Sequence, residues 1–99
     1  MKRPTPIRTQ QAAQTMGENL RTWRKLRGIT AQEMADKAAV SADTISRLEN
    51  GDPSIALHTF LNVCNALGIT ERIEEATDPY ETDYGRARAD QALPQRVRR

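Results

Sequence analysis

Two short segments within residues 29–51 carry matching helix-start signals, and the gap between them admits only a tight turn. The first starts at Thr30, three residues before Glu33, which is the spacing of a capping box. The second starts at Ser41, whose hydroxyl can also cap a helix. A turn of about three or four residues fits between them, and Gly51 supplies a left-handed stop after the second. The stretch therefore predicts a helix-turn-helix.

Apolar residues in this stretch lie where two crossed helices would touch. Ile29 is placed to pack on Met34 at the start of the first helix. The residues expected to hold the two helices together are Ala35, Val40, Ile45 and Leu48. Helices paired in this way read DNA through the second helix.

Residues on both sides of the motif match one family in order. The matching residues are Leu20, Arg24, Gly28-Ile29-Thr30, Glu33-Met34-Ala35, Val40-Ser41, Thr44-Ile45-Ser46, Leu48-Glu49-Asn50-Gly51, Leu57, Thr59-Phe60-Leu61 and Ala66-Leu67-Gly68. Through this series, residues 15–69 resemble the phage-repressor and Cro family of helix-turn-helix proteins, often called the XRE type. The resemblance implies an all-α fold, a compact four- to five-helix lambda-repressor-like DNA-binding domain with flexible N- and C-terminal tails.

The chain divides into three parts on this interpretation. We expect a basic N-terminal arm over residues 1–14, the DNA-binding domain over 15–76 and a flexible tail over 77–99. The arm contains Lys2, Arg3 and Arg8 and no acid. It is either a solvated terminus or an arm that contacts DNA.

Three further helices are predicted around the motif. The first starts between Thr9 and Thr15 and ends at Gly28, the next runs from about residue 57 to 67, and a short one from 71 to about 76. Their expected core residues are Met16, Leu20 and Trp23 in the first helix, and Leu57, Phe60, Leu61, Cys64 and Leu67 in the next.

Two positions depart from the family pattern. Ala31 stands where the family usually has a glutamine that touches backbone phosphate, and Gln32 is the expected substitute. Ala39 stands where the family usually has glycine in the turn. A left-handed conformation at Ala39 costs about 1 kcal/mol of strain, which a folded domain tolerates.

The second helix of the motif is expected to enter the major groove, so its outward residues are candidate base readers. Arg47 is the strongest, because its guanidinium matches the O6 and N7 acceptors of guanine. Asp43 either accepts from a cytosine amino group, repels phosphate, or complements the positive helix N-terminus. The base-reading candidates are Ala42, Asp43, Ser46 and Arg47.

Other polar residues are expected to contact the DNA backbone. Thr44 is placed to reach phosphate. His58 and Thr59 lie in the first turn of their predicted helix, where backbone N–H groups bind phosphate. The phosphate candidates are Gln32, Ser41, Thr44, His58 and Thr59.

The family resemblance also implies an ion pair between Arg24 and Glu49, which would tie the first helix to the end of the recognition helix. The alternative is two solvated charges that contribute under about 1 kcal/mol. The resemblance favours the pair.

The tail has features of a partner-binding segment, since its apolar residues are too widely spaced to form a core. Its Leu-Pro-x-Arg-x-Arg end resembles HipB-like antitoxins, whose partners are HipA-type serine/threonine kinase toxins. This resemblance predicts an antitoxin that represses its own operon, and the alternative is a phage-type or operon-specific regulator with no toxin partner. The arginines either contact the partner or add charge contacts to DNA. The partner-binding candidates are Tyr80, Tyr84, Leu93, Arg96, Val97 and Arg98.

A homodimer on a palindromic operator is expected, because a single helix-turn-helix reads too few base pairs for useful specificity. Leu67, Ile69 and Ile73 are the predicted dimer contacts, since little chain remains to cover them.

Composition favours a cytoplasmic DNA-binding protein over an enzyme or a membrane protein. With one histidine, one cysteine and no glycine-rich phosphate loop, the chain has no predicted catalytic group, cofactor or metal site. No stretch approaches the roughly 20 apolar residues of a membrane span. A single cysteine cannot form an intrachain disulfide and fits a reducing compartment.

Overall fold

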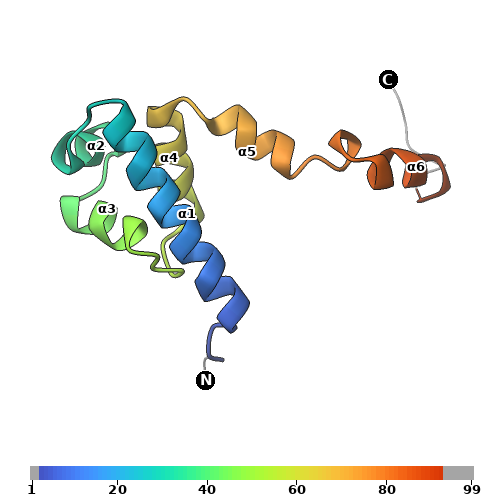
Figure 1. Cartoon of the computed structure of the whole chain (residues 1–99), viewed down its shortest axis with the longest axis horizontal. Helices are drawn as coiled ribbons and strands as arrows, with labels where there is room; N and C mark the ends of the chain where they lie inside the picture. The colour runs from blue at the N-terminus through green and yellow to red at the C-terminus, as the bar shows by residue number, and fades with distance from the viewer. Residues whose placement is uncertain (1–2, 93–99) are drawn as a thin grey trace. The chain divides into compact units, whose positions relative to one another are not determined.

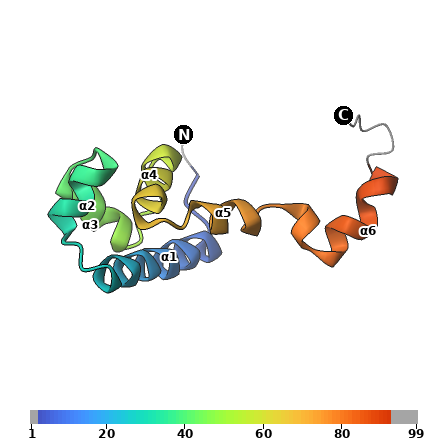
Figure 2. The ribbon, with the colours of Figure 1, turned by 90° about the horizontal axis from the view of Figure 1, so that it is seen from above.

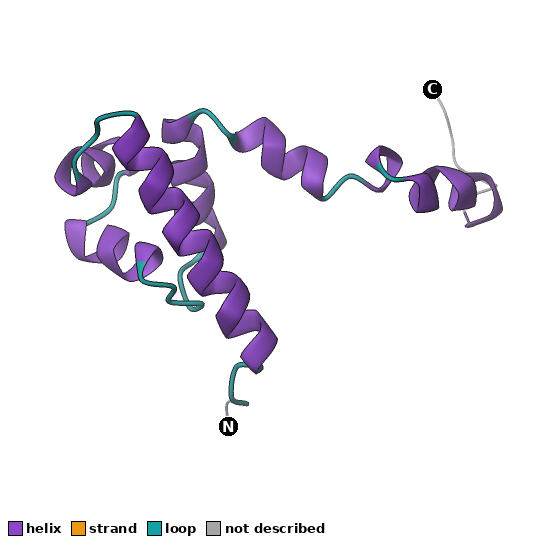
Figure 3. Cartoon of the chain, in the orientation of Figure 1, coloured by secondary structure: helices purple, strands orange, loops and turns teal. Residues whose placement is uncertain are grey.

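The structure is a computed structural model that describes residues 3–92. Every regular element in this part of the chain is helical, so the predicted all-α fold is confirmed (Figures 1 and 3). The elements are α1 (Ile7–Leu26), α2 (Ala31–Ala38), α3 (Ala42–Glu49), α4 (Leu57–Leu67), α5 (Thr70–Ala76), a 3-10 turn η1 (Pro79–Glu81) and α6 (Asp83–Ala92). They fall into two compact units, which divide between Ile69 and Thr70. Among the described residues, no helix is both long and apolar enough to cross a bilayer.

The first unit has a small apolar core. Helix α2 packs on α3 and α4, and α1 packs on α3, so that α1 lies along one side of the other three helices (Figure 2). Met34, Ile45, Cys64 and Leu67 are its largest fully buried side chains. Burying groups of this size supplies most of the stability of such a unit, at about 1.5–3 kcal/mol for each large apolar side chain.

The helix-turn-helix forms as its start signals predict. Thr30 and Glu33 make a complete capping box: the Glu33 N–H donates to Thr30 Oγ1 at 3.0 Å, and the Thr30 N–H donates to Glu33 Oε1 at 2.8 Å. Ser41 caps α3 by accepting from the Thr44 N–H at 3.1 Å. Ala39 ends α2 in the left-handed conformation, with φ of 60°. The turn therefore has the strained alanine that the departure from glycine implies.

Two glycines let α1 approach the end of α3. A Cβ on Gly17 would lie 2.6 Å from the Leu48 carbonyl oxygen, and one on Gly51 would lie 2.8 Å from Gln14 Cα. Gly51 also has φ of +87°, which side chains rarely adopt. Larger residues at either position would push the end of α3 away from α1.

Helix α1 starts earlier than predicted, at Ile7 rather than between Thr9 and Thr15, so it runs through most of the predicted basic arm. Thr15, which has the spacing of a capping box with Glu18, lies inside the helix instead of starting it. The helix-forming residues between 9 and 15 extend the helix past that signal, and Pro6, which needs no N–H partner, precedes its first turn.

Two predicted core residues are exposed. Met16 is largely accessible and Leu57 is 68% exposed. Both border an open apolar hollow of about 330 Å³ between α1 and the start of α4. Trp23 and Phe60 are half-buried. The helical period placed Met16 and Leu57 on the faces that border this hollow, where both side chains stay accessible.

The second unit contains structure where the sequence predicted a flexible tail. Asp78 caps η1 by accepting from the Tyr80 N–H at 2.9 Å, and Thr82 Oγ1 accepts from the Gly85 N–H at 2.9 Å. A Cβ on Gly85 would collide with the Pro79 carbonyl, so η1 and α6 meet closely only because this residue is glycine. The prediction missed these elements because short polar side chains, rather than apolar burial, define them. The flexibility of residues 77–99 in solution stays a prediction.

Candidate nucleic-acid interface

Helix α3 separates its residues into two faces. Ile45 and Leu48 are buried in the core of the first unit. Asp43, Ser46 and Arg47 are exposed, while Ala42 and Thr44 are half-buried. The helix is eight residues long, so its exposed side chains lie within about two turns of its N-terminus. The predicted base readers therefore share one accessible surface, which could enter a DNA groove.

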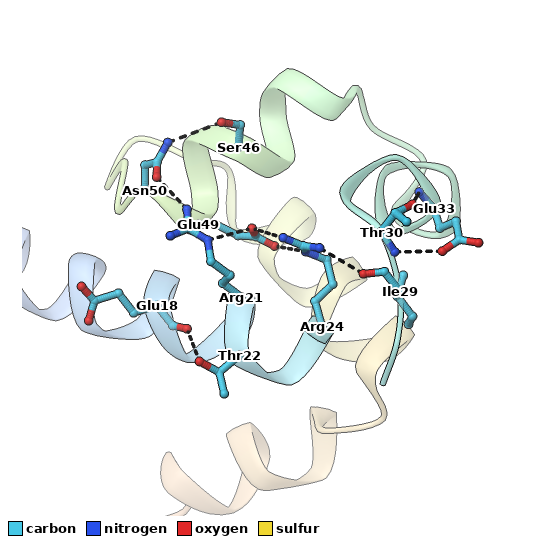
Figure 4. A network of polar contacts seen from close by, with 10 residues as sticks. All are labelled: Glu18, Arg21, Thr22, Arg24, Ile29, Thr30, Glu33, Ser46, Glu49 and Asn50. Atoms are coloured by element: carbon cyan, nitrogen blue, oxygen red, sulfur yellow. Dashed lines mark hydrogen bonds and ion pairs between the residues drawn. The ribbon is translucent and has the colours of Figure 1, made fainter. Parts of the chain in front are cut away.

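The orientation of α3 is fixed by the pair that the resemblance implies. Arg24 Nε donates to Glu49 Oε2 at 2.7 Å and Nη2 donates to Oε1 at 2.9 Å, in a two-pronged contact (Figure 4). The side chains are 12% and 6% exposed. Arg24 Nη1 also donates to the Ile29 carbonyl at 3.0 Å, just before the motif. One guanidinium thus joins α1, the start of the motif and the end of α3.

The hydrogen bonds to Glu49 raise the pKa of Arg24, an effect that desolvation opposes and the Coulomb attraction of Glu49 reinforces. The arginine is consequently charged at any pH at which the protein folds. A buried carboxylate with a charged partner is stable only while both are present.

Arg21 extends this contact in a way that the sequence analysis missed. Its Nε donates to Glu49 Oε1 at 3.3 Å, and its Nη2 donates to Asn50 Oδ1 at 2.7 Å. The Asn50 amide in turn donates to Ser46 Oγ at 3.4 Å (Figure 4). A chain of contacts thus runs from α1 to a candidate base reader. The sequence offers one signal for the role of Arg21: it precedes Arg24 by three residues, so both arginines lie on the same face of α1.

Arg47 is not an isolated side chain. Its Nε donates to Asp52 Oδ2 at 2.9 Å, and its Nη2 lies 2.8 Å from the same oxygen. Asp52 Oδ1 accepts from the Ser54 N–H at 2.8 Å and from the Ser54 hydroxyl at 2.6 Å. The two Ser54 hydrogen bonds, with the ion pair to Arg47 next, lower the pKa of Asp52 to about 2. The sequence analysis assigned no role to Asp52 or Ser54.

Most of the residues predicted to contact phosphate are accessible, and one has a buried side chain. Gln32, Ser41 and His58 are exposed. Gln32 donates to Asp36 Oδ1 at 3.1 Å, and its side chain stays on the surface of α2. Thr59 is buried, 5% exposed, because the first turn of α4 directs it toward the core. Its N–H donates to the Ala56 carbonyl at 3.1 Å, so the predicted phosphate contact of Thr59 is disfavoured but stays a prediction.

Two of the predicted dimer contacts are wrong. Leu67 and Ile69 belong to the core of the first unit, since α2 and α4 together supply the cover that was assumed to be missing. Ile73 is half-buried. A fully buried side chain cannot contact a second chain without rearrangement.

Of the predicted partner-binding residues, the structure describes only Tyr80 and Tyr84. Tyr84 is largely exposed, and the Arg88 guanidinium lies 5.2 Å from the centre of its ring. The remaining candidates, Leu93, Arg96, Val97 and Arg98, lie outside the described residues.

Comparison with known proteins identifies the family of this chain and a relative. A family model described as a helix-turn-helix domain matches residues 15–77. The HTH-type transcriptional repressor RghR of Bacillus subtilis (strain 168) is 35% identical over 81 residues, which cover 70% of this chain and 60% of that protein. The chain thus spans about three fifths of the length of this relative. No solved structure matches the chain.

Proposed function

Because this chain belongs to the helix-turn-helix domain family, we propose that it is a sequence-specific DNA-binding transcriptional repressor. One observation carries the proposal: Asp43, Ser46 and Arg47 form an exposed row on α3, whose far end is tied to α1 by the buried Arg24–Glu49 pair. A reading helix must be held rigidly, because base-edge hydrogen bonds tolerate little displacement. The name of the B. subtilis relative supports the assignment as a repressor.

The proposed mechanism assigns different roles to the exposed residues. The N-terminal half of α3 enters the major groove, where Arg47 and Ser46 hydrogen-bond base edges and Ala42 contacts a thymine methyl. Asp43 either accepts from a cytosine amino group or complements the helix N-terminus. Gln32, Ser41, Thr44 and His58 contact phosphates and fix the register. Occupation of a promoter by the protein then blocks transcription.

A homodimer on a palindromic operator is part of the proposal. Two helices α3 that face successive turns of the major groove would double the number of base pairs read. With Leu67 and Ile69 buried, Ile73 is the one remaining candidate contact from the sequence analysis. Sedimentation of the protein with and without operator DNA tests the dimer, and a monomer in both states would contradict it.

The narrower hypothesis of a HipB-like antitoxin stays a prediction. Its sequence support lies mainly in residues 93–99, outside the described part of the chain. The alternative, a phage-type or operon-specific XRE regulator without a toxin partner, accords better with the name of the B. subtilis relative.

Selection from random duplexes tests the central proposal. The wild-type protein should enrich one sequence. Arg47→Ala should weaken the binding free energy to that sequence by about 1–3 kcal/mol and should lose the base preference at one position. Lys25→Ala removes an exposed charge from α1 and is the matched control, which should preserve the base preference. Failure of the wild-type protein to enrich any sequence would refute sequence-specific binding. If Arg47→Ala weakened all sequences equally, Arg47 would be a phosphate contact.

A further inference from the structure

The guanidinium of Arg47 offers two hydrogen-bonding edges, and Asp52 occupies one of them. The contacts to Asp52 Oδ2 come from Nε and Nη2, at 2.9 and 2.8 Å. Nη2 also lies 3.5 Å from Ser54 Oγ, at the long limit of a hydrogen bond. Within residues 3–92, Nη1 makes no hydrogen bond to the protein. The side edge is therefore filled, while the end formed by Nη1 and Nη2 retains donors.

Asp52 is held by the loop that carries it. Its second oxygen accepts both the N–H and the hydroxyl of Ser54. The preceding residue, Gly51, is fixed in a left-handed conformation against Gln14 of α1. The low pKa of Asp52 keeps the carboxylate charged throughout the physiological range. The carboxylate is thus a fixed anchor rather than a mobile surface charge.

We propose that Asp52 is a positioning residue that sets Arg47 to read one guanine. It holds the Nε–Nη2 edge and leaves the Nη1–Nη2 end to donate to the O6 and N7 acceptors of the base. This inference rests on the proposed function. An unrestrained arginine samples many rotamers and can bind any phosphate, whereas a restrained one favours the base that fits its geometry.

The negative charge of Asp52 has a second effect in the same direction. It offsets the charge of Arg47 and repels nearby phosphates, so the pair adds little to sequence-independent affinity. Asp52 therefore increases discrimination among base pairs more than it increases overall binding. If Asp52 only blocked Arg47 from DNA, the result would differ. Removal of Asp52 would then strengthen binding to every sequence and leave the discrimination among base pairs unchanged.

The experiment compares full-length wild-type protein with Asp52→Asn, Arg47→Ala and the double variant. Each protein is titrated with a pool of random duplexes of about 20 bp. Each is also titrated with the duplex that the wild type enriches. The enriched duplex is also tested with the other three bases at the position that Arg47→Ala relaxes. Asp52→Asn retains an oxygen that can accept from Ser54, so it preserves the turn while removing the charge. Asp36→Asn, which removes an exposed carboxylate from α2, is the matched control for charge.

The wild type should prefer guanine by roughly 5- to 150-fold, the range expected of a good bidentate pair. Asp52→Asn should reduce this preference toward parity, by up to about 10-fold, without weakening binding to random duplexes, and should have no further effect when Arg47 is already alanine. Asp36→Asn should leave the preference intact. Asp52→Glu keeps the charge but displaces the carboxylate, so it should lower the preference without strengthening binding to random DNA. Circular dichroism melts confirm that each variant folds.

Several outcomes would overturn the inference. One is a guanine preference of wild-type size in Asp52→Asn and Asp52→Glu. Another is an effect of Asp52→Asn that persists undiminished in the Arg47→Ala background. If Arg47→Ala relaxes a position and the Asp52 variants do not, the inference fails while the proposed function stands. If the wild type enriches no sequence, the proposed function is wrong, and the inference about Asp52 is wrong as well.

Discussion

Glu49, at the end of α3, lies between two arginines of α1 and couples the two helices. It is 6% exposed and accepts from both Arg24 and Arg21, while Arg24 continues to the Ile29 carbonyl. The sequence predicted only the Arg24–Glu49 pair, through a family resemblance. A buried ion pair adds little net stability over an apolar one, but loss of one partner leaves the other charge stranded. Glu49 therefore specifies how α3 sits on α1.

A double-mutant cycle tests this role. Glu49→Ala should lower the free energy of unfolding by about 2–4 kcal/mol, because Arg24 stays desolvated without its partner. The double variant with Arg24→Ala should be less destabilised than Glu49→Ala alone. Arg21→Ala is the control, since its partly exposed contact should contribute under about 1 kcal/mol. Urea unfolding that shows no coupling between Arg24 and Glu49 would make both ordinary surface charges.

Asp52 has a lowered pKa that a titration can measure. Its pKa is lowered from the ordinary 3.8 to about 2, so its carboxylate stabilises the folded state fully above pH 3.8 and loses that contribution as pH falls through about 2. The stability difference between wild type and Asp52→Asn should accordingly shrink over this acidic window. Carbon-13 NMR titration measures the pKa directly.

The two partners of Asp52 should affect this pKa unequally. Ser54→Ala should raise it further than Arg47→Ala, because the hydroxyl hydrogen bond of Ser54 is the largest cause of the shift. The opposite order would mean that the ion pair with Arg47 dominates.

At the scale of elements, the turn of the helix-turn-helix contains a strained backbone conformation that a substitution can relieve. Ala39 has φ of 60°, which costs an L-residue about 1–2 kcal/mol. Ala39→Gly removes that cost but gives the unfolded chain about 0.4–1 kcal/mol of extra entropy. We expect a net gain of roughly 0.5–1 kcal/mol in the free energy of unfolding, measured in urea. Ala38→Gly, at the buried last residue of α2, is the control and should destabilise by about 1 kcal/mol, because glycine has a lower helix propensity than alanine. If Ala39→Gly and Ala38→Gly lowered the free energy of unfolding equally, the conformation of Ala39 would not be strained.

Local signals in the sequence predicted the elements that depend on them. The capping box at Thr30, the cap at Ser41 and the stop at Gly51 all form where they were expected. The start of α1 was not predicted, since helix propensity overrode the nearest capping signal. Nor was the Arg47–Asp52 contact, because it depends on how the loop after α3 turns. A one-dimensional pattern predicts hydrogen bonds within a turn better than contacts between a helix and a loop.

At the scale of the whole molecule, burial decided which predictions the structure disfavours. Leu67, Ile69 and Thr59 were assigned to partners or DNA, yet all three lie in the core of the first unit. A helical period identifies the apolar face of one helix but not how far neighbouring helices cover it. Met16 and Leu57 show the converse error, since both were assigned to the core and both are exposed.

The last prediction separates the first unit from the tail. Deleting residues 77–99 should leave operator affinity and its salt dependence nearly unchanged, because the proposed DNA-contacting residues of α2, α3 and α4 all lie within residues 1–69. The antitoxin hypothesis adds that this deletion abolishes binding of a HipA-type kinase. Fluorescence anisotropy at several salt concentrations measures the first effect, and co-purification measures the second.

The competing outcome is a tail that binds DNA through its basic end. Residues 93–99 contain Arg96, Arg98 and Arg99, and each phosphate contact contributes about 0.9 to the slope of log affinity against log salt. Loss of these contacts would flatten the slope by roughly two to three and weaken binding to every sequence alike. A triple arginine-to-alanine variant that reproduces this flattening would assign the tail to DNA. The antitoxin hypothesis would then lose its sequence support. Base discrimination by Arg47 should be unaffected, because phosphate contacts raise affinity for every sequence without selecting bases.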